Sequence, residues 1–190
     1  MTKERNRRAD ETRCLCLWGP GMLGRLNNVA QGLMPQLSLH SPVGDLTVSQ
    51  EDDVLVALDF GWGRDQVPTP LLKETLKQLN AYFDGKLTAF DLPLKPSGTE
   101  FQRRVWRQMT KIPYGRVMTY GAVASKLKSG ARPVGTACGR NPLPIIIPCH
   151  RIVGTQSLGG YSGDGGLKTK GALLTLEGAD EKYTQMELGI

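Results

Sequence analysis

The sequence predicts an α/β (α+β) protein, with a small strand-containing N-terminal unit and a mainly helical C-terminal unit. Short apolar runs separated by turn residues fill residues 37–60, a pattern typical of antiparallel strands. Residues 69–85 and 97–139 instead carry apolar residues at helical spacing, with helix-capping residues near their starts. An aperiodic stretch at 86–98, which contains two prolines, separates the two units.

The 190 residues therefore divide into four segments. They are an N-terminal extension, an α/β domain with its linker, a C-terminal domain and a tail, at residues 1–35, 36–94, 95–184 and 185–190. The extension has a basic start and only a short apolar patch before a Gly-Pro-Gly turn, so we expect a tail or added leader and no signal peptide. No apolar run approaches the ~18 residues that cross a bilayer, so we expect no membrane partner.

The four cysteines do not form a disulfide scaffold, which favours a reducing, cytoplasmic setting, or the nucleus if the organism is eukaryotic. Cys14, Cys16 and His40 make a weak metal site, because zinc sites usually present two spaced pairs of ligands. We therefore expect no metal and no cofactor.

In the N-terminal unit, the runs at 37–39, 46–48 and 54–58 predict a hairpin or meander of strands. A helix then opens at Thr69-Pro70, because Thr caps a helix well and Pro suits its first position. Its apolar stripe ends before Gly85 and indicates core packing, with no chemistry implied.

In the C-terminal unit, Ser97 and Glu100 have the spacing of a capping box for a first helix. Thr119 caps a second helix, and a third runs from Arg132 to Cys138. The last two are short and are joined by a turn containing glycine, which is the helix-turn-helix pattern.

Positive charge is concentrated in this unit. Residues 95–140 carry ten lysines and arginines against Glu100 alone, whereas the whole chain has a net charge of +6. A solvated basic face would explain such a run, but within a folded segment a polyanion explains its self-repulsion better. Nucleic acid is the leading partner.

The stretch Pro144–Val153 presents a candidate nucleophile. Three isoleucines between two prolines predict a short buried strand, after which Cys149 stands beside His150 and Arg151. Such neighbours favour the reactive thiolate, although a free cysteine is more often a buried structural residue. Local sequence leaves both interpretations open.

A glycine-rich loop at 154–166 follows the thiol, and a final helix spans 168–176. Glu177 ends that helix, where an acidic residue is unfavourable on dipole grounds. We therefore expect a specific partner for Glu177, and His150 is the natural candidate.

Ordered motifs resemble one family. The most specific is Ile147-Pro-Cys-His-Arg-Ile-Val153, and supporting motifs are Ser41–Gly44, Phe90–Leu94, Gly98–Gln102, Ile112–Gly115, Thr119–Gly121, Gly139–Pro142, Gly160–Ser162 and Leu176–Gly178. Over about residues 36–180 the chain resembles the O6-alkylguanine-DNA alkyltransferases, also called methylated-DNA–protein-cysteine methyltransferases. The resemblance implies a ribonuclease-H-like N-terminal unit without that activity.

The resemblance also implies a single-turnover enzyme of DNA repair. Cys149 would take the alkyl group from O6-alkylguanine, and O4-alkylthymine stays open as a second substrate. His150 would take the thiol proton through a water and Glu177 would orient it, while Asn141 matches the family's hinge. The implied base-binding residues are Tyr120, Pro144, Cys149, Ile152, Tyr161 and Ser162.

By the same resemblance, the helix-turn-helix would bind duplex DNA in the minor groove and the damaged base would be flipped out. Arg132 matches the arginine that fills the vacated space, and Tyr120 the tyrosine that promotes flipping. The other implied DNA contacts are Arg116, Thr119, Ala131, Gly135, Arg140 and Arg151. We expect a monomer in solution, and the sequence leaves cooperative binding on DNA open.

Two departures stand out: Ala172 replaces a tryptophan usual in the family, and Cys138 replaces a bulkier residue expected beside the base. One rival hypothesis is a cysteine hydrolase that uses Cys149, His150 and Glu177. A second is a non-enzymatic helix-turn-helix regulator that senses oxidation or alkylation. The hydrolase leaves the basic segment unexplained.

Overall fold

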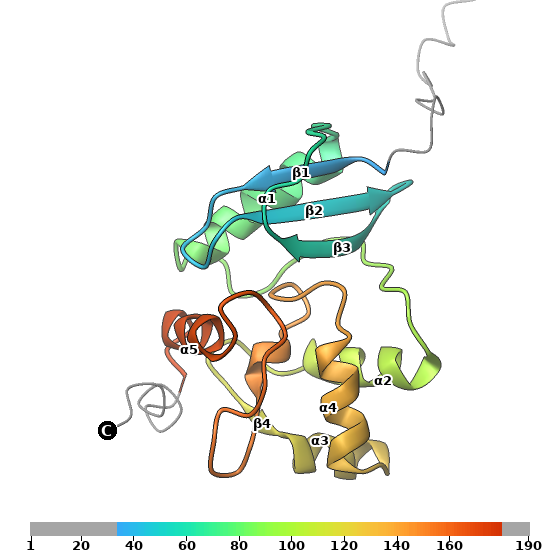
Figure 1. Ribbon diagram of the computed structural model, residues 1–190, viewed down its shortest axis with the longest axis vertical. Coiled ribbons are helices and arrows are strands. Elements are labelled where there is room, and N and C mark those ends of the chain that lie inside the picture. Colours follow the sequence, from blue (N-terminus) through green and yellow to red (C-terminus); the bar gives the residue numbers. More distant parts are fainter. Residues whose placement is uncertain (1–33, 180–190) are drawn as a thin grey trace, which may run out of the picture. The chain divides into compact units, whose positions relative to one another are not determined.

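The computed structural model describes residues 34–179 (Figure 1). The predicted extension at 1–35 lies almost entirely outside these residues, and the predicted tail at 185–190 lies wholly outside them. Cys14 and Cys16 of the weak metal site are outside as well. Between residues 34 and 179, no group of three His, Cys, Asp or Glu side chains could hold a metal ion.

A three-stranded antiparallel sheet with the order β1-β2-β3 forms the start of the described chain (Figure 1). Its strands are β1 Gln36–Leu39, β2 Leu46–Glu51 and β3 Val54–Phe60. The predicted meander is confirmed, because β1 pairs with β2 and β2 with β3, both in antiparallel fashion.

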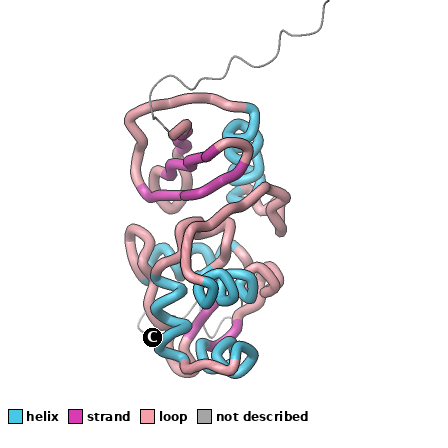
Figure 2. The backbone as a smooth tube through the Cα atoms, turned by 90° about the vertical axis from the view of Figure 1, so that its right-hand side faces the viewer, coloured by secondary structure: helices cyan, strands magenta, loops and turns pink. Residues whose placement is uncertain are grey.

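Helix α1, Pro70–Phe83, packs against β1 and β2 (Figure 2). Thr69 caps it as predicted, since its Oγ1 accepts a hydrogen bond of 3.1 Å from the backbone N–H of Leu72. The helix buries Leu72, Leu79 and Tyr82 against the core. Apolar spacing thus places this helix correctly.

The C-terminal part is built mainly of helices. They are α2 Glu100–Met109, α3 Tyr120–Leu127, α4 Ala131–Gly139 and α5 Leu167–Leu176, with the short parallel strands β4 Met118–Thr119 and β5 Ile152–Val153. Helices α3 and α4 pack against each other and join at Lys128, whose φ of 51° is left-handed. This is the predicted helix-turn-helix.

The predicted capping box of α2 is wrong by two residues. The cap is Thr99, whose Oγ1 accepts from the N–H of Gln102, while Gln102 Oε1 accepts from the N–H of Thr99 at 2.7 Å. The chain stays extended through Thr99, so the helix begins at Glu100 and Ser97 lies before it.

The predicted isoleucine strand is also wrong. Ile145–Ile147 are buried, but their backbone folds into turns, with the N–H of Ile147 donating to the carbonyl of Leu143 at 2.8 Å. Ile145 has a left-handed φ of 71°, which a strand does not allow, and the flanking prolines have no N–H to donate to a ladder. Cys149 then opens a 3₁₀ turn, η1 Cys149–Arg151.

One backbone bond joins the sheet to the segment before this turn, since the N–H of Leu58 in β3 donates to the carbonyl of Pro142 at 2.8 Å. A single core contains apolar residues from both parts of the described chain. The sheet unit therefore supports the turns that lead to Cys149.

Thr99→Ala should destabilise the protein by about 1 kcal/mol, because it removes the side-chain cap of α2. Ser97→Ala is the matched control and should change the free energy of unfolding little, since Ser97 lies outside the cap. Urea denaturation of both variants measures the difference. Equal losses in the two variants would contradict the observed start of the helix.

Candidate active site

The turn η1 places three consecutive side chains, Cys149, His150 and Arg151, in the interior. Cys149 lies at the wall of a pocket of about 590 Å³. Side chains or backbone of Tyr120, Ala131, Arg132, Gly135, Tyr161 and Ser162 line the same pocket. Residues from α3, α4 and the loop before α5 therefore converge on the thiol, and all of them were predicted site residues.

The predicted contact between His150 and Glu177 is present. His150 Nε2 lies 2.8 Å from Glu177 Oε1, and both side chains are fully buried. Burial alone would raise the pKa of Glu177, but hydrogen bonds from His150 and Arg151 outweigh it and lower the pKa to about 2. The carboxylate can only accept, so Nε2 must carry the proton that it shares with Glu177.

His150 therefore offers its second ring nitrogen as an acceptor. Burial lowers the pKa of His150, so the imidazole is neutral. Nδ1 is buried and has no hydrogen-bond partner among the residues that the structure describes. A neutral ring with Nε2 protonated and Nδ1 unpaired is prepared to receive a proton.

Arg151 lies in the interior, contrary to its expected contact with DNA. Its Nε and Nη2 donate to the two oxygens of Glu177 at 2.8 and 2.9 Å, and Nη1 donates to the carbonyl of Ile112 at 2.6 Å. The guanidinium is thus committed to a buried ion pair, because a buried carboxylate needs a charged partner. We assign Arg151 to the support of Glu177.

Two further donors to Glu177 were missed by the sequence analysis. The hydroxyl of Tyr82, in α1, donates to Oε1 at 2.7 Å, and the N–H of Gly115 donates to Oε2 at 3.2 Å. Tyr82 lies on the apolar stripe of its helix, where a tyrosine is indistinguishable from a core residue. No local signal marks its hydroxyl as part of the site.

Asn141 anchors the segment before the thiol. Its Nδ2 donates to the carbonyl of Ile147 at 2.7 Å, and its Oδ1 accepts from the N–H of Leu143 at 3.1 Å. Burial raises the pKa of Cys149, while a hydrogen bond from Asn141 and the charge of Lys170 act against that rise. The thiol is therefore protonated at rest and needs a base to become a thiolate.

Lys170 in α5 is a third residue that the sequence analysis missed. It is fully buried, and its Nζ donates to the carbonyls of Ile152 and Leu158 at 2.5 Å and to that of Gly160 at 3.2 Å. Burial lowers its pKa to about 8, against the opposing pull of Cys149 and Cys138. In the sequence Lys170 stands in a Lys-x-Lys pattern, which does not indicate that its side chain is buried.

Tyr120 and the glycine loop shape the mouth of the pocket. The Tyr120 hydroxyl donates weakly to the carbonyl of Gly160 at 3.4 Å, and Lys170 Nζ lies 5.8 Å from its ring centroid. Gly159 has a φ of 70°, and a Cβ there would lie 2.7 Å from the Tyr120 ring. A glycine is thus required for this close approach.

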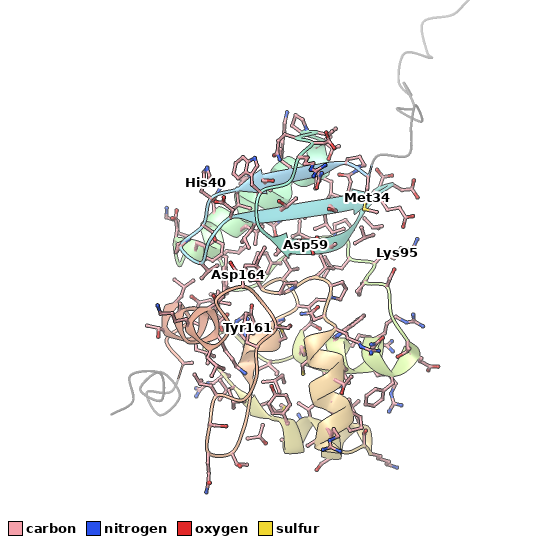
Figure 3. The ribbon with its side chains drawn as sticks, in the orientation of Figure 1. Met34, His40, Asp59, Lys95, Tyr161 and Asp164 are labelled. Atoms are coloured by element: carbon pink, nitrogen blue, oxygen red, sulfur yellow. The ribbon has the colours of Figure 1, made fainter. Side chains whose placement is uncertain are left out.

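Of the other residues expected to contact the base, Tyr161 lines the pocket and Pro144 and Ile152 do not. Tyr161 lies on the loop before α5 (Figure 3), and its buried hydroxyl has no partner between residues 34 and 179. Pro144 and Ile152 lie outside the lining of the pocket. Cys138 does line it, as its position beside the expected base implied.

A basic surface accompanies the pocket. Arg132, Arg140 and Arg116 are exposed, whereas the Thr119 hydroxyl caps α3 by accepting from Ala122 at 3.2 Å. Of the ten basic residues at 95–140, Lys95 alone forms an ion pair with another described residue. The other charges are available to a polyanion. In the described part of the chain, no helix is long and apolar enough to cross a membrane.

Comparisons with known proteins agree with this site. Residues 36–96 match the family described as 6-O-methylguanine DNA methyltransferase, ribonuclease-like domain, and residues 100–179 match its DNA binding domain. A methylated-DNA–protein-cysteine methyltransferase of Methanosarcina acetivorans is 39% identical over 150 residues, which cover 73% of this chain and 95% of that protein. One from Mycobacterium tuberculosis H37Rv is 42% identical over 150 residues, 74% of this chain and 90% of the relative.

Solved structures show the same similarity. The crystal structure of Mycobacterium tuberculosis O6-methylguanine methyltransferase matches with a TM-score of 0.68 and 39% identity, over 77% of this chain and 93% of the other. The structure of the Mycobacterium tuberculosis protein OGT in complex with DNA matches with a TM-score of 0.68 and 41% identity, over 78% and 94%. Matches to both domains and to these relatives show that the chain belongs to the 6-O-methylguanine DNA methyltransferase family.

Proposed function

We propose that this member of the family repairs DNA by moving an alkyl group from O6-alkylguanine in a duplex to Cys149. The observation that carries the proposal is a buried thiol at the wall of a pocket, followed in the chain by His150, whose ring is paired with Glu177. The pocket volume of about 590 Å³ falls in the range of sites for small molecules and so suits a single base.

DNA would approach the pocket along α4. The exposed cations on and around the helix-turn-helix supply phosphate contacts, and Arg132 lies at the pocket rim. Because O6 of a stacked guanine is out of reach, the base must leave the helix and enter the pocket. Arg132 would occupy the space that the base leaves.

The reaction combines a proton transfer to His150 with the transfer of the alkyl group to Cys149. His150 Nδ1 takes the Cys149 proton through a water, and the resulting imidazolium is held by Glu177. The thiolate attacks the alkyl carbon, forming an S–C bond while the C–O6 bond breaks. The released guanine regains one proton at N1, and a hydroxyl donor such as Tyr120 offsets its charge during departure.

Lys170 would favour the thiolate. It places a buried cation near Cys149 and ties the loop carbonyls of Leu158 and Gly160 to Ile152 at the start of β5. The product is a thioether, which ordinary reductants do not cleave, so each molecule would act once.

Incubation with duplex DNA that carries a labelled methyl group on guanine O6 should leave the label on the Cys149 peptide, in a ratio of at most one methyl group per protein. Peptide mass mapping checks the position. Cys138→Ser should still accept the label and Cys149→Ser should not. Repeated turnover, or label on Cys138 alone, would overturn the proposal and favour a hydrolase or a sensor.

Arg132→Ala should slow repair in duplex DNA roughly tenfold or more, because the extruded base costs a few kcal/mol to hold out of the stack. Reaction with free O6-alkylguanine base should be unaffected. Single-turnover rates on both substrates measure the ratio. An equal loss on the free base would rule out a role in base extrusion.

Lys170→Met should move the midpoint of the pH profile for Cys149 alkylation upward by about one unit, because an opposite charge nearby stabilises a thiolate by that order. Alkylation by iodoacetamide, followed on the Cys149 peptide, gives the midpoint. Lys168→Met is the matched control, since Lys168 is exposed on the same helix. Matching midpoints for both variants would exclude the charge effect.

A further inference from the structure

The proposed mechanism does not use the hydroxyl of Tyr82. This residue belongs to α1, in the sheet unit, whereas the proton relay of Cys149, His150 and Glu177 comes from the C-terminal part. Its side chain is fully buried and its hydroxyl donates to Glu177 Oε1 at 2.7 Å, across 95 positions of sequence. Through this hydrogen bond, a residue of the ribonuclease-like domain contacts the relay of the DNA binding domain directly.

The ring of Tyr82 is held firmly. Its centroid lies 5.3 Å from that of Phe83, 5.4 Å from that of Phe90 and 6.0 Å from that of Tyr114. Burial, followed by the charge of Glu177, raises the pKa of Tyr82 far above its usual value. The phenol therefore remains a hydrogen-bond donor throughout the pH range in which the thiol reacts.

Glu177 already has a full set of donors. Oε1 accepts from Tyr82, His150 and Arg151, and Oε2 accepts from Arg151 and Gly115. A carboxylate offers about four lone-pair sites, so five donors saturate it. Because the fork of Arg151 grips both oxygens, the carboxylate stays in place without Tyr82. The effect of Tyr82 is therefore on the charge of Oε1, the oxygen that His150 also contacts.

We propose that Tyr82 is a positioning residue for the transfer reaction, through which the sheet unit sets how strongly Glu177 holds the ring of His150. This inference deepens the proposed function and rests on it. The Tyr82 hydroxyl withdraws charge from Oε1 and so weakens the hydrogen bond that His150 Nε2 donates to Oε1. Tyr82 itself acts only through Glu177.

Several other groups face the relay, and all of them are unchanged in Tyr82→Phe. Glu177 is also faced by Tyr114, His150 and Arg151, and His150 is faced by Arg151 and Lys170. The groups around Cys149 are Asn141, Lys170, Cys138, Tyr120 and Tyr161. None of these comes from the sheet unit, so a change at position 82 isolates the effect of that unit.

The sign of the effect follows from the proton transfer. His150 becomes an imidazolium when Cys149 becomes a thiolate, so a stronger bond to Glu177 stabilises the charged pair. Removal of the Tyr82 hydroxyl strengthens that bond, and the thiolate should then form at lower pH. A purely structural role for Tyr82 would instead lower stability and leave the midpoint of reactivity where it is.

The test compares Tyr82→Phe with wild type in alkylation of Cys149 by iodoacetamide over a range of pH, followed on the Cys149 peptide. The variant should react roughly threefold faster on the acidic side of the profile, where a shift of about half a pH unit has this effect. Tyr114→Phe is the matched control, because its hydroxyl donates to the carbonyl of Leu176 at 3.0 Å and makes no bond to Glu177. Its profile should match wild type.

Site-specific difluorotyrosine at position 82 supplies a second arm that keeps the hydroxyl and the fold. Its more acidic phenol is a stronger donor, so the midpoint should move to higher pH. An unchanged midpoint in both variants, or shifts in the opposite directions, would overturn the proposal. Wild-type transfer of labelled methyl from DNA, measured separately, shows whether the proposed function itself fails.

Discussion

The carboxylate of Glu177 is the point on which the structure of the site depends. It is buried at the end of α5, yet it accepts hydrogen bonds from α1, from the turn before β4 and from two residues of η1. A buried anion is costly unless charged and neutral donors surround it, and Arg151 supplies the opposite charge. Four segments that are distant in sequence are consequently held together at one group.

This constraint explains why η1 is a 3₁₀ turn. In an extended strand, consecutive side chains point to opposite faces, so Cys149, His150 and Arg151 could not all face inward. The turn lets Cys149 face the pocket while His150 and Arg151 face Glu177. The prolines and Asn141 upstream hold the isoleucines in buried turns that lead into this geometry.

The site also contains two buried cations, which have different roles. Arg151 neutralises Glu177, whereas Lys170 is held by three backbone carbonyls beside the thiols. The sequence analysis assigned Arg151 to DNA contacts and did not single out Lys170. Because both residues are buried, the charges that remain for phosphate contacts are the exposed cations of the helix-turn-helix. Arg132 is one of them and lies at the rim of the pocket.

Sequence alone determined the features that depend on neighbours a few residues apart: the meander, the Thr69 and Thr119 caps, the helix-turn-helix and the placing of Cys149 beside His150. It also predicted the pairing of Glu177 with His150, because an acidic residue at the end of a helix is unfavourable unless a specific partner stabilises it. Tertiary structure alone decided that Arg151 and Lys170 are buried and that Tyr82 reaches Glu177. Burial of a charge depends on partners far away in the chain, and no periodicity or spacing records which partners the fold will bring there.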